Sequence, residues 1–163
     1  MLGANSSENT IDLRRKTIRV METVVLGSTG IKVNKNGFGA LPIQRVSTED
    51  AVKLARKAYE AGITFFDTAR FYTDSEEKLG EAFDGMREKV YIATKTAAKN
   101  ADEFWEQLGI SLHNLRTDYI DIYQFHNPSF CPKPGDGTGL YEAMLEAKAQ
   151  GKIRHIGITN HRL

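Results

Sequence analysis

Segments of helical character alternate with short apolar segments of strand character along most of this chain, and this alternation constrains the fold more than any other feature. Expected strands lie at residues 37–41, 64–67, 90–95, 119–125 and 155–158, and expected helices lie at about 48–61, 75–85, 101–115 and 139–150. From the second strand onward, strands recur about every 30 residues, the length of a βα unit. Almost continuously apolar strands separated by helices predict a parallel sheet that helices cover.

The ends and buried sides of the expected helices can also be identified. Ser47 begins a segment that resembles a capping box, in which its hydroxyl accepts from an unpaired backbone N–H, and Gly62 ends the same helix. The apolar side chains expected on the buried sides are Val52, Leu54, Ala55, Ala58 and Tyr59, then Leu79, Ala82 and Phe83, then Phe104, Leu108, Leu112 and Leu115, and finally Leu140, Met144 and Ala147. Before these units, residues 22–33 form two short extended runs around a Gly-bounded turn, which is typical of a β-hairpin.

Two architectures accommodate this order of elements, an open doubly wound sheet and a (βα) barrel. A barrel places functional side chains at the carboxyl ends of several different strands. Asp67, Lys95 and His126 stand at three expected strand ends, and Asn160 follows the last strand. These positions favour the barrel. The predicted fold class is therefore α/β of the (βα)8 TIM-barrel type, limited here to about five strands and four helices after an N-terminal β-hairpin.

A carboxylate, an amine and an imidazole at these strand ends, with a phenol close by, suit acid–base chemistry. Tyr72 has an ordinary pKa of about 10, and a nearby Lys95 ammonium would lower that pKa by stabilising the phenolate. Asp67 can pair with Lys95, and His126 can hydrogen-bond a substrate oxygen or share a proton with Tyr72. Such a set can deliver a proton to a carbonyl oxygen that becomes an alkoxide. It contains no electron source, so a reduction would need a cofactor.

Composition narrows the range of partners and compartments. The 163 residues carry a net charge of +1, which gives no electrostatic case for binding nucleic acid or membranes. No apolar run approaches the roughly 20 residues that span a bilayer. The one cysteine, Cys131, cannot form an internal disulfide, so a cytoplasmic location is expected. For residues 1–20 a disordered tail is favoured over a basic transit-like segment, with residues 21–163 as the folded domain.

Four ordered motifs in this chain resemble those of the aldo-keto reductases. They are Asp67-Thr68-Ala69 with Tyr72 and Ser75-Glu76, then Ala93-Thr94-Lys95-Thr96, then residues 118–128 with His126-Asn127-Pro128, and finally residues 151–161 with Thr159-Asn160-His161. The match runs from about residue 22 to the end of the sequence. Residues 39–47 and 154–162 are similar to a branch of the family that often carries a C-terminal iron–sulfur domain. The sequence has no Cys cluster, so no metal is predicted.

The resemblance implies a role for each residue of the acid–base set. Tyr72 would be the general acid, Lys95 and Asp67 would tune it, and His126 would position the carbonyl of an aldehyde or ketone. One departure is Thr73, where the family usually has Gly. This departure leaves the four catalytic candidates intact.

The resemblance also implies a nicotinamide cofactor as the source of hydride, usually NADPH, with NADH as the alternative. Thr159 and Asn160 match the pair of residues that binds the nicotinamide carboxamide in this family. Gly39 and Ala40 would line the cofactor and substrate cleft.

The family's barrel has eight βα units, whereas the fifth strand is the last one that this sequence predicts. The part of the family's fold that clamps the adenosine phosphates and selects NADP over NAD lies beyond that point. A sheet of five strands leaves two unpaired edges, through which such a chain could associate with itself. Two other interpretations stay open: a nicotinamide-binding or regulatory barrel module without turnover, and an inactive fragment.

Overall fold

Five parallel strands form the main sheet of the computed structural model, which describes residues 22–161. Their order in the sheet is their order in the sequence: β3 (Phe38–Gly39), β4 (Phe65–Asp67), β5 (Tyr91–Thr96), β6 (Ile120–His126) and β7 (Ile153–Thr159). Each neighbouring pair runs parallel, and a helix connects each strand to the next. The predicted parallel sheet of the barrel type is therefore confirmed. The tail expected at residues 1–20 lies outside the described residues.

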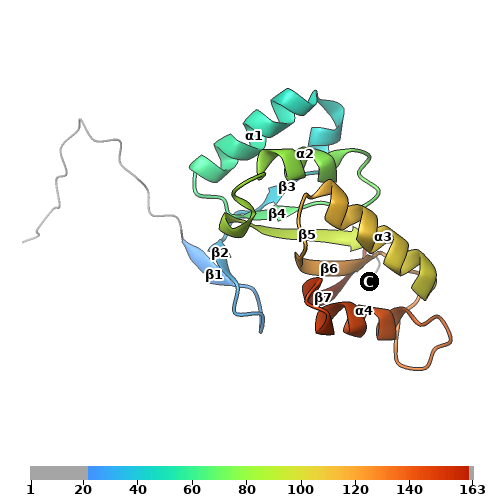
Figure 1. The fold of residues 1–163 in the computed structure, drawn as a ribbon. Coiled ribbons are helices and arrows are strands. Elements are labelled where there is room, and N and C mark those ends of the chain that lie inside the picture. The colour runs from blue at the N-terminus through green and yellow to red at the C-terminus, as the bar shows by residue number, and fades with distance from the viewer. Residues whose placement is uncertain (1–21, 162–163) are drawn as a thin grey trace, which may run out of the picture.

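The α-helices lie along the outside of this twisted sheet (Figure 1). They are α1 (Thr48–Glu60), α2 (Ser75–Ala82), α3 (Ala101–Asn114) and α4 (Leu140–Ala149), with short 3-10 helices η1 (Pro42–Arg45) and η2 (Arg87–Lys89). The Ser47 hydroxyl caps α1 by accepting from the backbone N–H of Asp50 at 3.1 Å, as the sequence predicted. None of the described helices has the length and apolar character required to span a bilayer.

The hydrophobic core lies between the sheet and the helices. Alternate side chains of a strand point to opposite faces, so Phe66, Ile92 and Tyr123 turn outward and are completely buried beneath the helix layer. The predicted inward residues of α2, α3 and α4 join them, either buried or packed against the buried cluster. The prediction for Leu54 was wrong, because this side chain is 48% exposed. It lies beside the buried stripe of α1, which is centred on Ala51 and Ala55.

The predicted β-hairpin is also confirmed. β1 (Thr23–Val25) pairs antiparallel with β2 (Lys32–Asn34), and together they lie at the amino-terminal end of the main sheet (Figure 1). The Asn34 amide donates to the carbonyl oxygen of Gly62 at 3.3 Å, just before β4 begins. The hairpin therefore leaves the carboxyl ends of the parallel strands uncovered.

The main sheet has two outer strands, β3 and β7. In the described part of the chain no strand pairs with the outer side of β7, as expected for a sheet that stops after five strands. Ile156 and Ile158 on this strand are 37% and 47% exposed. Apolar side chains thus border an open sheet edge.

Candidate functional site

The loop between β4 and α2 lies along the carboxyl end of β5. The backbone N–H of Thr68 donates to the carbonyl of Ala93 at 2.8 Å, and the N–H of Arg70 donates to the carbonyl of Lys95 at 3.0 Å. These bonds continue the contact between the two strands beyond the end of β4. They hold the loop so that Tyr72, two residues after Arg70, comes close to Lys95.

Lys95 lies at the centre of the predicted acid–base group. Its side chain is 6% exposed, and its ammonium donates to Asp67 Oδ1 at 2.7 Å and to the carbonyl oxygen of Thr68 at 2.6 Å. The same Nζ atom lies 5.3 Å from the centre of the Tyr72 ring. These partners compensate the cost of burying a positive charge. The carboxylate and the phenol thus lie on either side of one fixed ammonium.

His126, at the end of β6, completes the group. Its imidazole meets the Tyr72 ring nearly edge-on, with 5.7 Å between ring centres and an interplanar angle of 80°. Burial lowers the pKa of His126 most, the positive charges of Lys95 and His161 lower it further, and Asp67 opposes this change. The imidazole is therefore mainly neutral at pH 7, a form that can donate one hydrogen bond.

The expectation that the pKa of Tyr72 would be lowered was wrong. Burial raises the pKa of this phenol above its ordinary value of 10.0, and the negative charge of Asp67 raises it further. The ammonium of Lys95, which is paired with Asp67 and lies 5.3 Å from the ring centre, does not reverse this shift. Tyr72 is accordingly a protonated phenol at neutral pH.

The two residues expected on the β3 side of the cleft differ in exposure. Gly39 is aligned with Asp67 in the sheet, and a Cβ added to Gly39 would meet no atom within 4 Å, so the space above it is open. Ala40 is completely buried. Its N–H donates to the carbonyl of Asp67 at 2.8 Å, and its carbonyl accepts from the Ser75 hydroxyl at 3.0 Å. The backbone of Ala40 therefore joins the ends of β3 and β4 to the start of α2.

Thr159 and Asn160 lie on the opposite side, at the end of β7. Thr159 is aligned with His126, and its hydroxyl accepts from the N–H of Asn127 at 3.0 Å. Asn160, Asn127, Pro128 and Ser129 line a hollow of about 210 Å³. An uncharged hollow with amide side chains fits the neutral carboxamide of a nicotinamide, which both donates and accepts hydrogen bonds. The residues present are thus compatible with the cofactor that the resemblance implies.

A larger hollow of about 280 Å³ adjoins His126. Its walls come from the loops that follow β5 and β6 and from the start of α4: Thr96, Ala97, Ala98, Lys99, Phe125, His126, Asn127, Pro128, Ser129, Phe130 and Leu140. Of these residues, the sequence had indicated only His126 as part of a site, and it had indicated Leu140 as a core residue. The available signal for Lys99 was its place in the short loop between an expected strand and an expected helix. Nothing in the sequence placed α4 beside this hollow.

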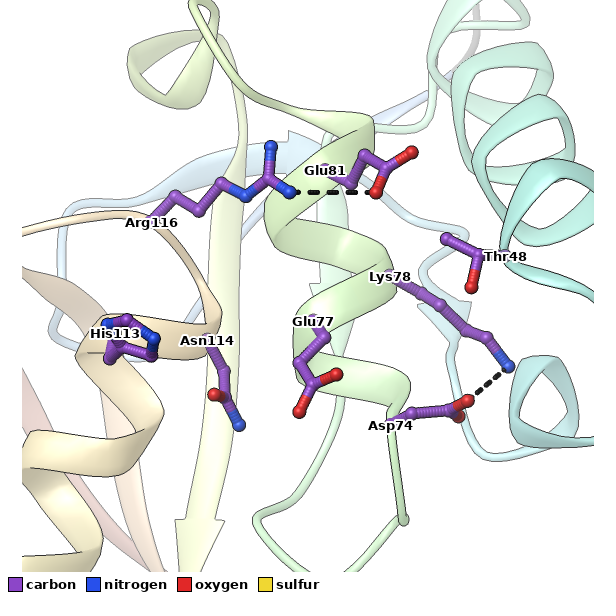
Figure 2. A pocket seen from close by; sticks show the side chains of 8 residues that line it. All are labelled: Thr48, Asp74, Glu77, Lys78, Glu81, His113, Asn114 and Arg116. Atoms are coloured by element: carbon purple, nitrogen blue, oxygen red, sulfur yellow. Dashed lines mark ion pairs between the residues drawn. The ribbon is translucent and has the colours of Figure 1, made fainter.

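Another hollow, of about 430 Å³, lies in the helix layer among α1, α2 and the end of α3 (Figure 2). Four of its charged side chains form two ion pairs. Lys78 pairs with Asp74 at 2.8 Å and donates to the carbonyls of Ile43 and Val46, and Arg116 reaches Glu81 at 3.5 Å. The described residues contain no group of three or more His, Cys, Asp or Glu side chains placed to hold a metal ion. One of the two ion pairs lies at the start of α2, and the other joins α2 to the segment after α3.

A family model and individual relatives of known sequence all assign this chain to the same family. The model of the aldo/keto reductase family matches residues 31–163. An L-galactose dehydrogenase of Arabidopsis thaliana is 34% identical over 154 residues, which cover 85% of this chain and 48% of the plant protein. An aldo-keto reductase of Bacillus subtilis is 35% identical over 159 residues, which cover 86% of this chain and 47% of that protein. The chain spans about half the length of these curated relatives.

Solved structures agree with this assignment. An aldo-keto reductase from Bacillus halodurans in its holo form has a TM-score of 0.78 and 31% identity, over 87% of this chain and 51% of that one. An aldo-keto reductase from Klebsiella pneumoniae in complex with NADPH has a TM-score of 0.75 and 31% identity, over 86% of this chain and 50% of that one. The sequence match and the shared strand order lead to one conclusion: the chain belongs to the aldo/keto reductase family.

Proposed function

We propose that this chain carries the acid–base residues of a nicotinamide-dependent reductase that converts an aldehyde or ketone into an alcohol. One observation carries the proposal: Lys95 Nζ contacts Asp67 and faces the Tyr72 ring, which in turn contacts His126. Family membership supports the reaction class, and the relative solved with NADPH supports the cofactor. Because the chain spans about half of its relatives, the proposal concerns the site that its own residues build.

Tyr72 would act as the proton donor. Its raised pKa keeps the proton on the phenol at neutral pH until a substrate carbonyl oxygen gains negative charge and accepts it. The ammonium of Lys95, 5.3 Å from the ring centre, would then stabilise the phenolate that remains. The ion pair with Asp67 holds that ammonium in place during the transfer.

His126 and the strand-end residues would bind and orient the reactants. The neutral imidazole of His126 donates a hydrogen bond to the carbonyl oxygen and so directs it toward the Tyr72 hydroxyl. When bound, NADPH, or NADH as the alternative, would supply the hydride. Gly39 would leave room for the nicotinamide, while Thr159 and Asn160 would border its carboxamide.

The substrate class is proposed as small carbonyl compounds. The hollow beside His126 is compact and partly apolar, and a methylglyoxal reductase of Salmonella typhi is 39% identical to this chain over 124 residues. No nucleic-acid or membrane partner is proposed. Cytoplasmic location and self-association through the open sheet edges stay predictions, the latter supported by the exposed Ile156 and Ile158.

The proposal is tested by carbonyl-dependent oxidation of NADPH, measured with methylglyoxal and a panel of aldehydes and ketones. Tyr72→Phe removes the acidic hydroxyl and keeps the ring, so we expect kcat to fall about 100- to 10,000-fold. Tyr141→Phe is the matched control, because Tyr141 lies on α4 and lines a different, apolar hollow. Its kcat should equal that of the unmodified chain.

Equal rates for Tyr72→Phe and the unmodified chain would remove Tyr72 from the mechanism. If the chain binds NADPH, by fluorescence titration, but oxidises it with no member of the panel, the regulatory module is the better interpretation. Absence of both binding and turnover would instead favour the inactive fragment.

A further inference from the structure

Glu76 is a carboxylate buried behind the sheet, on the side opposite the acid–base group. It lies in the first turn of α2, and its side chain is 0% exposed. One oxygen, Oε1, accepts from the Thr94 hydroxyl at 2.7 Å and from the Ser111 hydroxyl at 2.8 Å. The other oxygen, Oε2, pairs with the Arg70 guanidinium. A charge this deeply buried is tolerated only when it is paired and hydrogen-bonded.

The partners of Glu76 connect it to the two elements that carry the proposed chemistry. Thr94 immediately precedes Lys95, and the two side chains point to opposite faces of β5. Arg70 belongs to the loop that carries Tyr72, and its backbone N–H donates to the carbonyl of Lys95. Glu76 is therefore linked by one side chain to the strand of Lys95 and by another to the loop of Tyr72.

The two kinds of contact have different consequences. The Thr94 and Ser111 hydroxyls belong to β5 and α3, which the hydrophobic core already holds together. Arg70 is 17% exposed and belongs to the loop between β4 and α2, where Phe71 is 60% exposed. Thr68 and Ala69 at the start of this loop are buried, so the ion pair with Glu76 anchors the loop at the point where that burial ends.

We propose that Glu76 is a positioning residue for Tyr72 and acts through Arg70. The inference rests on the proposed function, because the position of Tyr72 matters for catalysis only if Tyr72 donates the proton. The geometry itself is independent of turnover. The Glu76–Arg70 ion pair acts together with the backbone bonds that hold the loop, and the loop carries the Tyr72 ring to the His126 ring.

The test compares the double variant Arg70→Met/Glu76→Gln with the control Ser111→Ala. The double variant removes the link and leaves no unpaired buried charge, which makes folding more favourable than loss of one partner alone. The control removes one hydrogen bond to the same carboxylate and leaves the Arg70 link in place. The measured quantity is the nuclear Overhauser contact between the Tyr72 and His126 ring protons in the full chain, together with kcat and KM.

We expect the ring contact to weaken strongly in the double variant and to remain in Ser111→Ala, although both variants lose stability. In the turnover assay, kcat should fall about 10- to 100-fold in the double variant with KM nearly unchanged, as expected for a misplaced acid. An unchanged ring contact in the double variant, or an equal loss in Ser111→Ala, would overturn the proposal. If the double variant fails to fold while Glu76→Gln alone folds and keeps the contact, Glu76 does not position Tyr72 and the proposal is overturned. If both variants fail to fold, Glu76 holds the fold and not the loop, which also overturns it. The ring contact can be read even if the chain shows no turnover, so failure of the proposed function is a separate outcome.

Discussion

Thr73 bears backbone strain in the loop that carries Tyr72. Its φ is +44°, in the left-handed region where a β-branched residue is disfavoured by about 1–2 kcal/mol relative to Gly. The resemblance to the family had implied Gly at this position, and the backbone angle explains the preference. Glycine also has more conformational entropy in the unfolded chain, and this offsets part of the stability gained by removing the strain.

We therefore predict that Thr73→Gly raises the free energy of unfolding by about 0.5–1 kcal/mol relative to Thr73→Ala. Both variants remove the same hydroxyl, so the comparison isolates the backbone angle. Chemical denaturation of the two variants measures the difference. A Gly variant less stable than the Ala variant would show that residue 73 is not strained.

The identities of the candidate catalytic residues could be predicted from the sequence, but some of their properties could not. Asp67, Lys95 and His126 stand at strand ends, and Tyr72 follows one of them at a distance that a short loop can span. The direction of the pKa shift of Tyr72 depends on burial and on the negative charge of Asp67. Both depend on packing in three dimensions, which a list of residue types does not contain.

At the scale of elements, the contact between α2 and α3 depends on Gly80. A Cβ on this residue would lie 2.1 Å from the carbonyl oxygen of Asn114 and 3.0 Å from the backbone of Leu115. Backbone atoms cannot move aside without separating the helices. Gly109 in α3 offers the opposite case, because a Cβ there would meet no atom within 4 Å.

The same substitution should therefore have opposite effects at the two sites. Gly80→Ala should lower the free energy of unfolding by about 1–3 kcal/mol through overpacking. Gly109→Ala should raise it by up to about 1 kcal/mol, because Ala has the higher helix propensity. Thermal or chemical unfolding followed by circular dichroism measures both. Similar values for the two variants would contradict the close approach of α2 to α3.

The order and type of the helices and strands could be predicted because apolar periodicity and helix ends are local signals. Element limits shifted by a few residues, as for β7, which begins at Ile153 and not at His155. The exposure of Leu54 could not be predicted, since α1 is covered on one side only and its buried stripe is narrow. The hydrogen-bond partners of Glu76 could not be predicted from the sequence either, because one of them, Ser111, lies 35 residues away along the chain.

At the scale of the whole molecule, the site depends on the parallel order of the strands. The carboxyl ends of successive parallel strands lie at the same edge of the sheet, and residues that are far apart in the sequence meet there. These residues are Gly39, Asp67, Lys95, His126 and Thr159. The sheet order was predictable from the βα repeat. The distances that bring Tyr72 to Lys95 and His126 were not, because they depend on the twist of the sheet and the path of the loop.

The pH dependence of kcat for carbonyl reduction tests the central claim, that Tyr72 donates the proton, most directly. Under the proposed function, catalysis requires the protonated phenol, whose pKa is raised above the ordinary value of 10.0. The account predicts a kcat that stays level from about pH 7 through pH 9 and falls only above about pH 10. A fall with a midpoint at about pH 6–8, where an imidazole loses its proton, would contradict it.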